Sequence, residues 1–313
     1  MHPTSKNQGG ALLTALFIMT LIAIVATAMS TRLQLDIYRA RLIITHDKLY
    51  LATQAVTFWS LGELSNKNLQ FTKQNAQGMV DIYPKNREAI DNQIQLTGGI
   101  FDLQARFNLN NLLDKKSLPS FINLIGNAYP NATNPEKNNI ALGLKDWLDN
   151  YDLARGKDIY TAYYLAQNPP YFPSHQPMKS SSEFRLVKEV SAPIYLALEP
   201  YITALPEPTP ININTAPKQV LMSLGNGISD AQASELIMAR GENGVKNIKD
   251  INELLSKFDI PTEQITIESK YFLNVAYAKN NESSLVVYTL LKRTKNKSGQ
   301  LSVSIIRESI NNF

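Results

Sequence analysis

The sequence predicts an α+β protein: a long N-terminal helix packed on a small antiparallel sheet, with a large all-helical domain inserted between the strands. Three observations indicate this fold. An uncharged apolar run near the N-terminus continues as an amphipathic helical pattern. Strand-like alternation then follows, and strand character is absent for about 160 residues before it returns at the C-terminal end.

The N-terminal helix begins with a stretch that carries no charged side chain. It runs from Gly9 to Thr31 and is framed by Lys6 and Arg32. Roughly 20 apolar residues in a helix span the hydrocarbon core of a bilayer, whereas the apolar core of a cleaved secretory signal has about 7–15 residues. We therefore expect a retained single-pass transmembrane helix over residues 10–30. The flanking charges alone do not decide its orientation.

Helical periodicity continues beyond this anchor. Apolar side chains recur at three-to-four spacing from Leu33 to about Leu64, opposite a polar face. No proline lies between Thr4 and Pro84, so one helix from Gly10 to about Leu64 is predicted, on the order of 80 Å long. Its second half needs a packing partner, and we expect this to be its own C-terminal domain. The apolar positions concerned are Leu35, Tyr38, Leu42, Leu49, Ala52, Val56 and Trp59.

Strands are predicted on both sides of a helical block. A short strand is expected at 79–83, and residues 94–109 alternate, with Gly98 and Gly99 marking a turn or bulge. Residues 111–270 read as short helices separated by loops. The last strands are expected to lie beside 94–109 and cover the long helix; they form a predicted antiparallel meander over 271–278, 284–294 and 301–309.

These patterns divide the chain into consecutive segments. A proline-rich run at 205–210 reads as a stiff, extended linker between two helical subdomains. The predicted segments are a leader (1–9), the transmembrane part of the helix (10–30), the rest of the helix with the first strands (31–109), a first helical subdomain (110–205), a second helical subdomain (211–268) and the C-terminal strands (269–313).

Composition excludes several classes of active site. The chain has no cysteine, so disulfides, thiol catalysis and cysteine metal sites are excluded. Its three histidines, His2, His46 and His175, have no metal-binding spacing and no adjacent catalytic partner. The net charge of +4 gives no broad basic field for nucleic acid. We therefore expect a protein without enzymatic activity.

Three segments carry a family resemblance. Lys6 followed by Gly9 and an apolar helix resembles the prepilin peptidase site of type IV pilins and pseudopilins, and residues 9–13 (GGALL) resemble the start of the protein K family of type II secretion systems, the largest minor pseudopilins. Residues 144–152 (LKDWLDNYD) and 211–216 (ININTA) resemble two later segments of the same family, in the same order and with similar spacing.

The resemblance implies a fold, a place and a role. It implies a pilin-like domain interrupted by a helical domain, in a tip subunit of the periplasmic pseudopilus that helps to export folded proteins across the outer membrane of a Gram-negative bacterium. Its implied partners are two other minor pseudopilins, the prepilin peptidase and the inner membrane, and further a secreted substrate or the secretin. Processing by the peptidase, with methylation, and a periplasmic C-terminal domain are also implied.

Two N-terminal positions follow from this resemblance. Cleavage is expected between Gly9 and Gly10, although the apolar residue usual at the first mature position leaves a cut after Gly10 as an alternative. Ordinary pilins carry glutamate at the fifth mature position, which is Thr14 here if cleavage follows Gly9. A buried carboxylate without a cationic partner is costly, so a neutral residue suits a tip subunit with no neighbour above it. The alternative is that Thr14 is one more tolerated residue of a membrane helix.

An acidic cluster is the candidate metal site. Asp149, Asp152 and Asp158, near Asp146, supply the closely spaced oxygen ligands that calcium requires, and some family members are similar in binding calcium in this domain. Arg155 and Lys157 would oppose a dication. The alternative reading is a solvated loop with local ion pairs.

Residues 212–253 resemble a helix–hairpin–helix, with helices at 216–224 and 230–240 around a 225–228 hairpin. Such hairpins bind nucleic-acid phosphates in membrane-anchored DNA receptors, which is the alternative function. No basic residue lies between Gly225 and Glu235, and Lys218 and Arg240 are distant from the turn. The sequence therefore favours a structural copy of the motif and no nucleic-acid partner.

Overall fold

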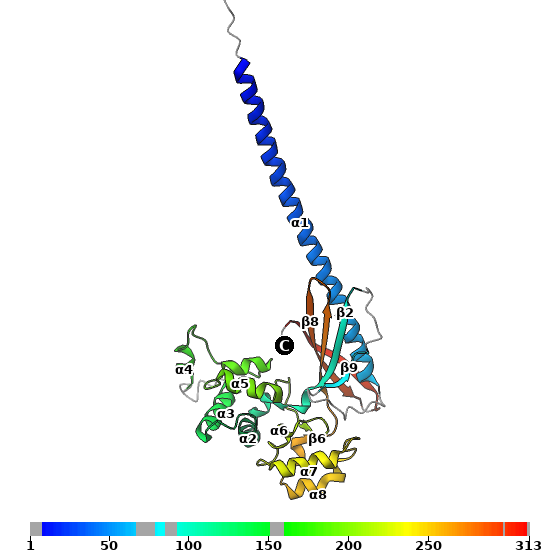
Figure 1. The fold of residues 1–313 in the computed structure, drawn as a ribbon. Helices are drawn as coiled ribbons and strands as arrows, with labels where there is room; N and C mark the ends of the chain where they lie inside the picture. Colours follow the sequence, from blue (N-terminus) through cyan, green and yellow to red (C-terminus); the bar gives the residue numbers. More distant parts are fainter. Residues whose placement is uncertain (1–7, 67–78, 85–92, 151–159, 297, 312–313) are drawn as a thin grey trace, which may run out of the picture.

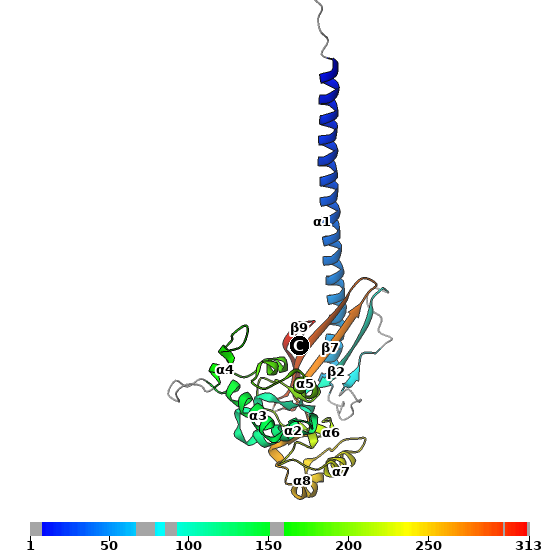
Figure 2. The same cartoon turned by 60° about the vertical axis from the view of Figure 1, so that its left-hand side comes forward.

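A computed structural model describes residues 8–66, 79–84, 93–150, 160–296 and 298–311. It consists of a long rod and a body at one end of that rod (Figure 1). The rod is helix α1, Gln8–Ser65, which agrees with the single long helix predicted from the sequence. Its N-terminal part extends far from the rest of the chain, and both views show the body at the opposite end (Figures 1 and 2).

Only the C-terminal part of α1 packs on its own domain. The predicted apolar positions from Leu49 onward, including Val56 and Trp59, are buried against the sheet. The expectation was wrong for Leu35 and Tyr38, which are 52% and 58% exposed, and Leu42 is also exposed. The physical reason is length, because α1 runs beyond the edge of the sheet before it reaches the anchor.

The sheet has five strands in the order β1-β2-β7-β8-β9, and every neighbouring pair is antiparallel. As predicted, the C-terminal meander returns beside the earlier strand, because β7 pairs with β2 over the full length of β2. The packed face of α1 and the sheet share one apolar core. The strands are β1 (Met79–Ile82), β2 (Gln95–Asp102), β7 (Tyr271–Lys279), β8 (Ser284–Lys295) and β9 (Leu301–Ile310).

The strand predicted over 94–109 is shorter in the structure. It ends at Asp102, whose carboxylate accepts a 2.8 Å hydrogen bond from the backbone N–H of Gln104 and caps a 3₁₀ turn, η1 (Leu103–Ala105). After this turn, β3 (Phe107–Asn108) pairs in parallel with β4 (Ile202–Thr203) inside the helical region. A side-chain cap, which alternation does not reveal, ends the strand.

The region between β2 and β7 is the helical insertion, and it has a core of its own. Among its described residues, β5 also pairs in parallel with β6. Helices α3 and α7 begin with capping boxes, formed by Thr133 with Glu136 and by Ser229 with Gln232. The remaining elements are α2 (Leu118–Ala128), α3 (Asn134–Leu148), α4 (Thr161–Leu165), α5 (Ala192–Leu198), β5 (Ile211–Asn212), α6 (Lys218–Leu221), α7 (Asp230–Arg240), α8 (Asn252–Lys257) and β6 (Ile265–Thr266), with 3₁₀ turns η2 (Leu109–Leu113), η3 (Lys115–Ser117), η5 (Ser181–Leu186), η6 (Glu199–Tyr201), η7 (Ile248–Ile251) and η8 (Thr262–Gln264).

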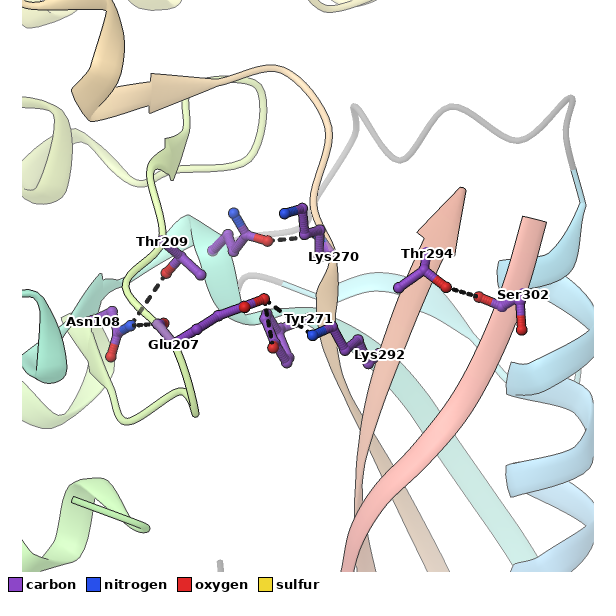
Figure 3. A network of polar contacts seen from close by, with 9 residues as sticks. Asn108, Glu207, Thr209, Lys270, Tyr271, Lys292, Thr294 and Ser302 are labelled. Carbon is purple, nitrogen blue, oxygen red and sulfur yellow. Dashed lines mark hydrogen bonds and ion pairs between the residues drawn. The ribbon is translucent and has the colours of Figure 1, made fainter. Parts of the chain in front are cut away.

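The proline-rich linker is fastened to the sheet by a polar network (Figure 3). The Glu207 carboxylate accepts a 2.8 Å hydrogen bond from the hydroxyl of Tyr271 and lies 3.1 Å from the Nζ of Lys292. On its other side, the Asn108 amide donates to the carbonyl of Glu207 at 2.8 Å. These contacts join the linker to β7, β8 and the start of the insertion, and so position the helical region relative to the sheet.

Candidate assembly surfaces

The anchor is the first candidate surface. The structure contains one helix that is long and apolar enough to cross a membrane among the residues it describes, and its apolar window has no buried residue. Large apolar side chains such as Leu12, Phe17 and Met29 are each more than half exposed. Surfaces of this kind are stable in lipid rather than in water. The helix therefore fits a single-pass membrane anchor.

The predicted processing site lies in the first turn of α1, which begins at Gln8. The backbone N–H groups of a first turn have no partner within the helix. Further along, the Thr14 hydroxyl donates to the carbonyl of Gly10, four residues earlier. Thr27 and Thr31 make the same contact with their own helix. Thr14 thus brings no polar group that needs a neighbour, while its role as a marker of the tip and the cleavage position stay predictions.

A second apolar stripe lies on the outer face of α1, below the anchor. Ile37, Ile44, Leu51 and Phe58 recur every seventh residue and are 54%, 57%, 61% and 69% exposed. At 100° per residue the Leu51–Phe58 side of the helix points away from the side that carries Val56. This outer stripe is continuous along the helix beyond the anchor and has no partner within the described part of the chain.

The orientation of the outer stripe is fixed by polar contacts between α1 and the sheet. Glu308 on β9 accepts hydrogen bonds from the Tyr50 hydroxyl at 2.7 Å and from the Gln54 amide at 3.1 Å. The hydrogen bond to Glu308, followed by burial, raises the pKa of Tyr50. In the buried interface, Asn274 accepts from Ser60 at 2.8 Å and donates to Thr57 at 3.0 Å. Buried polar pairs of this kind have one satisfied register, so they set the rotation of the helix.

The candidate calcium residues are only partly described by the structure. The carboxylate of Asp149 lies 2.5 Å from the Nζ of Lys145, four residues earlier on α3. An ammonium group at that position competes with a dication for the same oxygens. Asp152 and Asp158 lie outside the described residues. The calcium site stays a prediction, and Asp149, the one candidate ligand of the three within the described residues, has a cationic partner.

Two helices lie where the helix–hairpin–helix is predicted: α7 has the predicted bounds 230–240, whereas α6 covers only 218–221 of the predicted 216–224. Gly225 and Gly227 have positive φ in the turn between them, and the N–H of Gly225 donates to the Gln264 side chain at 2.8 Å. Both candidate cations are also engaged internally: Lys218 lies 2.6 Å from Asp230, and the Arg240 guanidinium donates to the carbonyls of Ile213 and Ala216 at 3.1 and 2.9 Å. The Gly225 N–H in this turn bonds within the protein. Nothing in the described residues of the turn favours phosphate binding.

The polar side chains of the motif at 211–216 make hydrogen bonds inside the protein and do not form an exposed surface. Asn214 donates to the carbonyl of Val245 at 3.0 Å and accepts from its N–H at 2.7 Å. Asn212 and Thr215 donate to the buried carboxylate of Asp102, at 2.9 and 2.5 Å. Ser269 adds a third side-chain donor to the same oxygen at 2.7 Å. The motif therefore ties the insertion to the end of β2.

Sequence reasoning missed Asp102 as the centre of this junction. Burial raises the pKa of its carboxyl, and the hydrogen bonds from Thr215, Ser269, Gln104 and Asn212 oppose that shift. The sequence offered one sign of this junction. Asp102 is an acidic residue in an alternating run with apolar residues, and residues with hydroxyl or amide side chains that could donate to it occur far along the chain. Trp147, by contrast, is a core residue, buried edge-on against Tyr164 with ring centroids 5.4 Å apart.

Two family models match the helical insertion. Both are described as type II secretion system protein K, and they cover residues 105–207 and 211–268. Relatives that match over most of their own length carry the same description. Type II secretion system protein K of Pseudomonas aeruginosa is 27% identical, over 92% of this chain and 90% of its own length. The Aeromonas hydrophila protein is 30% identical, over 79% of this chain and 80% of its own length.

A solved structure has the same fold. It is the crystal structure of the GspK-GspI-GspJ complex from the type 2 secretion system of enterotoxigenic Escherichia coli. The match has a TM-score of 0.63 and 22% identity, and it covers 90% of this chain and 99% of the matched chain. The chain therefore belongs to the type II secretion system protein K family and is a minor pseudopilin.

Proposed function

We propose that this minor pseudopilin is the tip subunit of a periplasmic pseudopilus, held there by two smaller minor pseudopilins of the GspI and GspJ type. One observation carries the proposal: the outer stripe of α1 (Ile37, Ile44, Leu51 and Phe58) is apolar and exposed beyond and beside the sheet. A helix that buries one face on its own domain and carries a second apolar face is suited to packing against other helices.

The energetics favour partners along the stem. Burying the remaining exposed surface of such side chains contributes on the order of 1 kcal/mol each. The seven-residue spacing is that of a helix–helix seam. The partner helices are those of sibling subunits, since the GspK relative of known structure is in a complex with GspI and GspJ.

The placement of the anchor and the insertion at opposite ends of the molecule supports a position at the tip. The anchor and the helical insertion lie at opposite ends (Figures 1 and 2). With the anchor in the inner membrane and the insertion in the periplasm, the insertion faces away from the membrane. There it is free to meet a secreted substrate or the secretin. In this proposal the prepilin peptidase cleaves between Gly9 and Gly10, which puts Thr14 at the fifth mature position.

Co-purification tests the proposal. The full chain, extracted in mild detergent, is expected to retain both smaller minor pseudopilins, and Leu51→Asp is expected to reduce their recovery about tenfold because it places a charge in the seam. His46→Asp is the matched control, since His46 is exposed on another face of α1. Equal recovery with Leu51→Asp and with the control contradicts the proposed use of the outer stripe.

A further inference from the structure

We infer that a groove between the two helical subdomains binds an extended, positively charged peptide segment of a partner protein. The groove has a volume of about 770 Å³ and is open to solvent. This lies within the range typical of ligand pockets, roughly 300–1,000 Å³. The inference does not depend on how the stem of the protein assembles, because the groove lies wholly within the insertion.

The walls of the groove come from three parts of the insertion. The first part is the 3₁₀ turn η3 (Lys115–Ser117) with Asp114 and the start of α2, and the second is the hairpin at 224–226 with the loop at 259–264. The third part is the proline-rich linker, with Pro208 and Pro210. The site therefore exists only because both subdomains and their linker meet at this point.

The walls are held in place by internal hydrogen bonds. The Asn111 side chain donates to the carbonyl of Thr209 at 2.8 Å and accepts from its N–H at 2.9 Å, which fixes the linker. Within the second part, the N–H of Gly225 donates to Gln264 at 2.8 Å, and the Asn226 amide donates to Asp259 at 3.3 Å. A preformed site loses little conformational entropy when a ligand binds.

The charges in the groove are predominantly negative. Asp114, Asp259 and Glu263 line it together with a single cation, Lys116. All four are exposed side chains, and neither Glu263 nor Lys116 has an ion-pair partner within the described part of the chain. Like charges gathered in a cleft focus the field and attract the opposite charge. The groove should therefore attract cations and repel nucleic acid.

The hydrogen-bonding groups of the lining point to a ligand that brings donors. Four prolines line the groove, at positions 119, 208, 210 and 261, and proline has no backbone N–H. Their rings provide apolar contacts for the stems of long side chains. Carboxylates and prolines together complement lysine or arginine on an extended backbone, whose N–H groups are free to donate.

A metal ion fits this groove poorly. Across the ranges that the structure describes, no three acidic or histidine side chains lie close enough together to hold one. Separate carboxylates suit a ligand that spaces its charges along a chain. The chemistry therefore favours a basic peptide segment over a single dication.

Fluorescence anisotropy with the full chain in detergent tests the inference. The probe is a short fluorescein-labelled peptide that alternates lysine and alanine, and the reference peptide carries glutamate in place of lysine. We expect the lysine peptide to bind and the glutamate peptide not to bind. Asp259→Asn with Glu263→Gln should weaken binding about tenfold. Asparagine accepts the positive φ of position 259, so the loop is preserved.

Matched controls make the result decisive. Glu253→Gln with Glu282→Gln changes the net charge by the same amount at exposed positions outside the groove and should leave binding unchanged. Lys116→Glu, which adds negative charge without removing a wall, should tighten binding several-fold. The inference is overturned if both peptides bind alike, if the groove and control variants weaken binding equally, or if Lys116→Glu leaves the affinity unchanged.

Discussion

At the scale of single residues, buried polar side chains decide how the parts of this protein meet. Asp102 is 1% exposed, and three side chains from the insertion, Asn212, Thr215 and Ser269, donate to one of its oxygens. A buried carboxylate is stable only when such donors satisfy it. Alternation of residue types placed Asp102 on a strand but could not reveal donors more than a hundred residues away.

The first prediction concerns this junction. Asp102→Ala should lower the free energy of unfolding by about 3 kcal/mol, because it leaves several buried donors without an acceptor. Asp36→Ala, at an exposed carboxylate on α1, should change it by less than about 0.5 kcal/mol. Urea denaturation followed by circular dichroism measures both. Equal, small effects would contradict the role given to Asp102.

The second prediction concerns pH and the Glu207 contact with the sheet. Hydrogen bonds from Tyr271 and then from Lys292 lower the pKa of Glu207 below its ordinary value of 4.5. A carboxyl with a lowered folded-state pKa stabilises the fold above its unfolded pKa, and this contribution is lost as the pH falls through the folded-state value. Wild type should therefore be more stable than Glu207→Gln at pH 7, and the difference should shrink on acidification below about pH 4.5.

Thermal unfolding between pH 7 and about pH 3 measures that difference. Glu253→Gln on α8 is the control, since Glu253 is exposed and lies on a helix of the insertion. A difference between wild type and Glu207→Gln that stays constant over the whole range would show that the carboxylate charge does not contribute.

At the scale of elements, α1 was largely predictable from the sequence, and its packing was predictable only in part: the positions from Leu49 onward are buried as expected, and Leu35, Tyr38 and Leu42 are not. Length, hydropathy and the absence of proline predicted one helix, as observed at Gln8–Ser65. The strands of the meander were also predicted to within one residue at each end, because turn residues separate runs of β-branched and aromatic side chains. The residue at which α1 extends past the sheet depends on the size of the sheet. The hydrophobic periodicity of the helix does not determine that size.

The third prediction concerns the close approach of α1 to β2. A Cβ atom at Gly98 would lie 2.5 Å from the Cγ1 of Val56 and 2.7 Å from the carbonyl oxygen of Val275. Gly98→Ala should therefore destabilise the protein by about 1–3 kcal/mol, because the helix must move away from the sheet. Gly62→Ala, at an open helical position, should be neutral or stabilising by up to about 1 kcal/mol. The same urea titration compares them, and equal effects would contradict the close packing.

At the scale of the whole molecule, the arrangement of rod, sheet and insertion is that of the protein K family. The sequence predicted this arrangement because strand patterns flank a helical block and because three motifs resemble the family. The groove between the subdomains could not be predicted in the same way. It is formed by Asp114, the proline-rich linker and Glu263, which are brought together only by the packing of the insertion.

The central claim is that α1 uses two opposite faces, one for its own sheet and one for sibling helices. Because the chain has no cysteine, a single introduced cysteine reports one position. The most direct measurement is disulfide crosslinking in membranes of secreting cells, with a second cysteine in the N-terminal helix of a smaller minor pseudopilin. Leu51→Cys, on the outer stripe, should crosslink, and Ala52→Cys, which is 5% exposed against the sheet, should not. Crosslinking that is equal at the two positions, or absent at Leu51→Cys, would contradict the account.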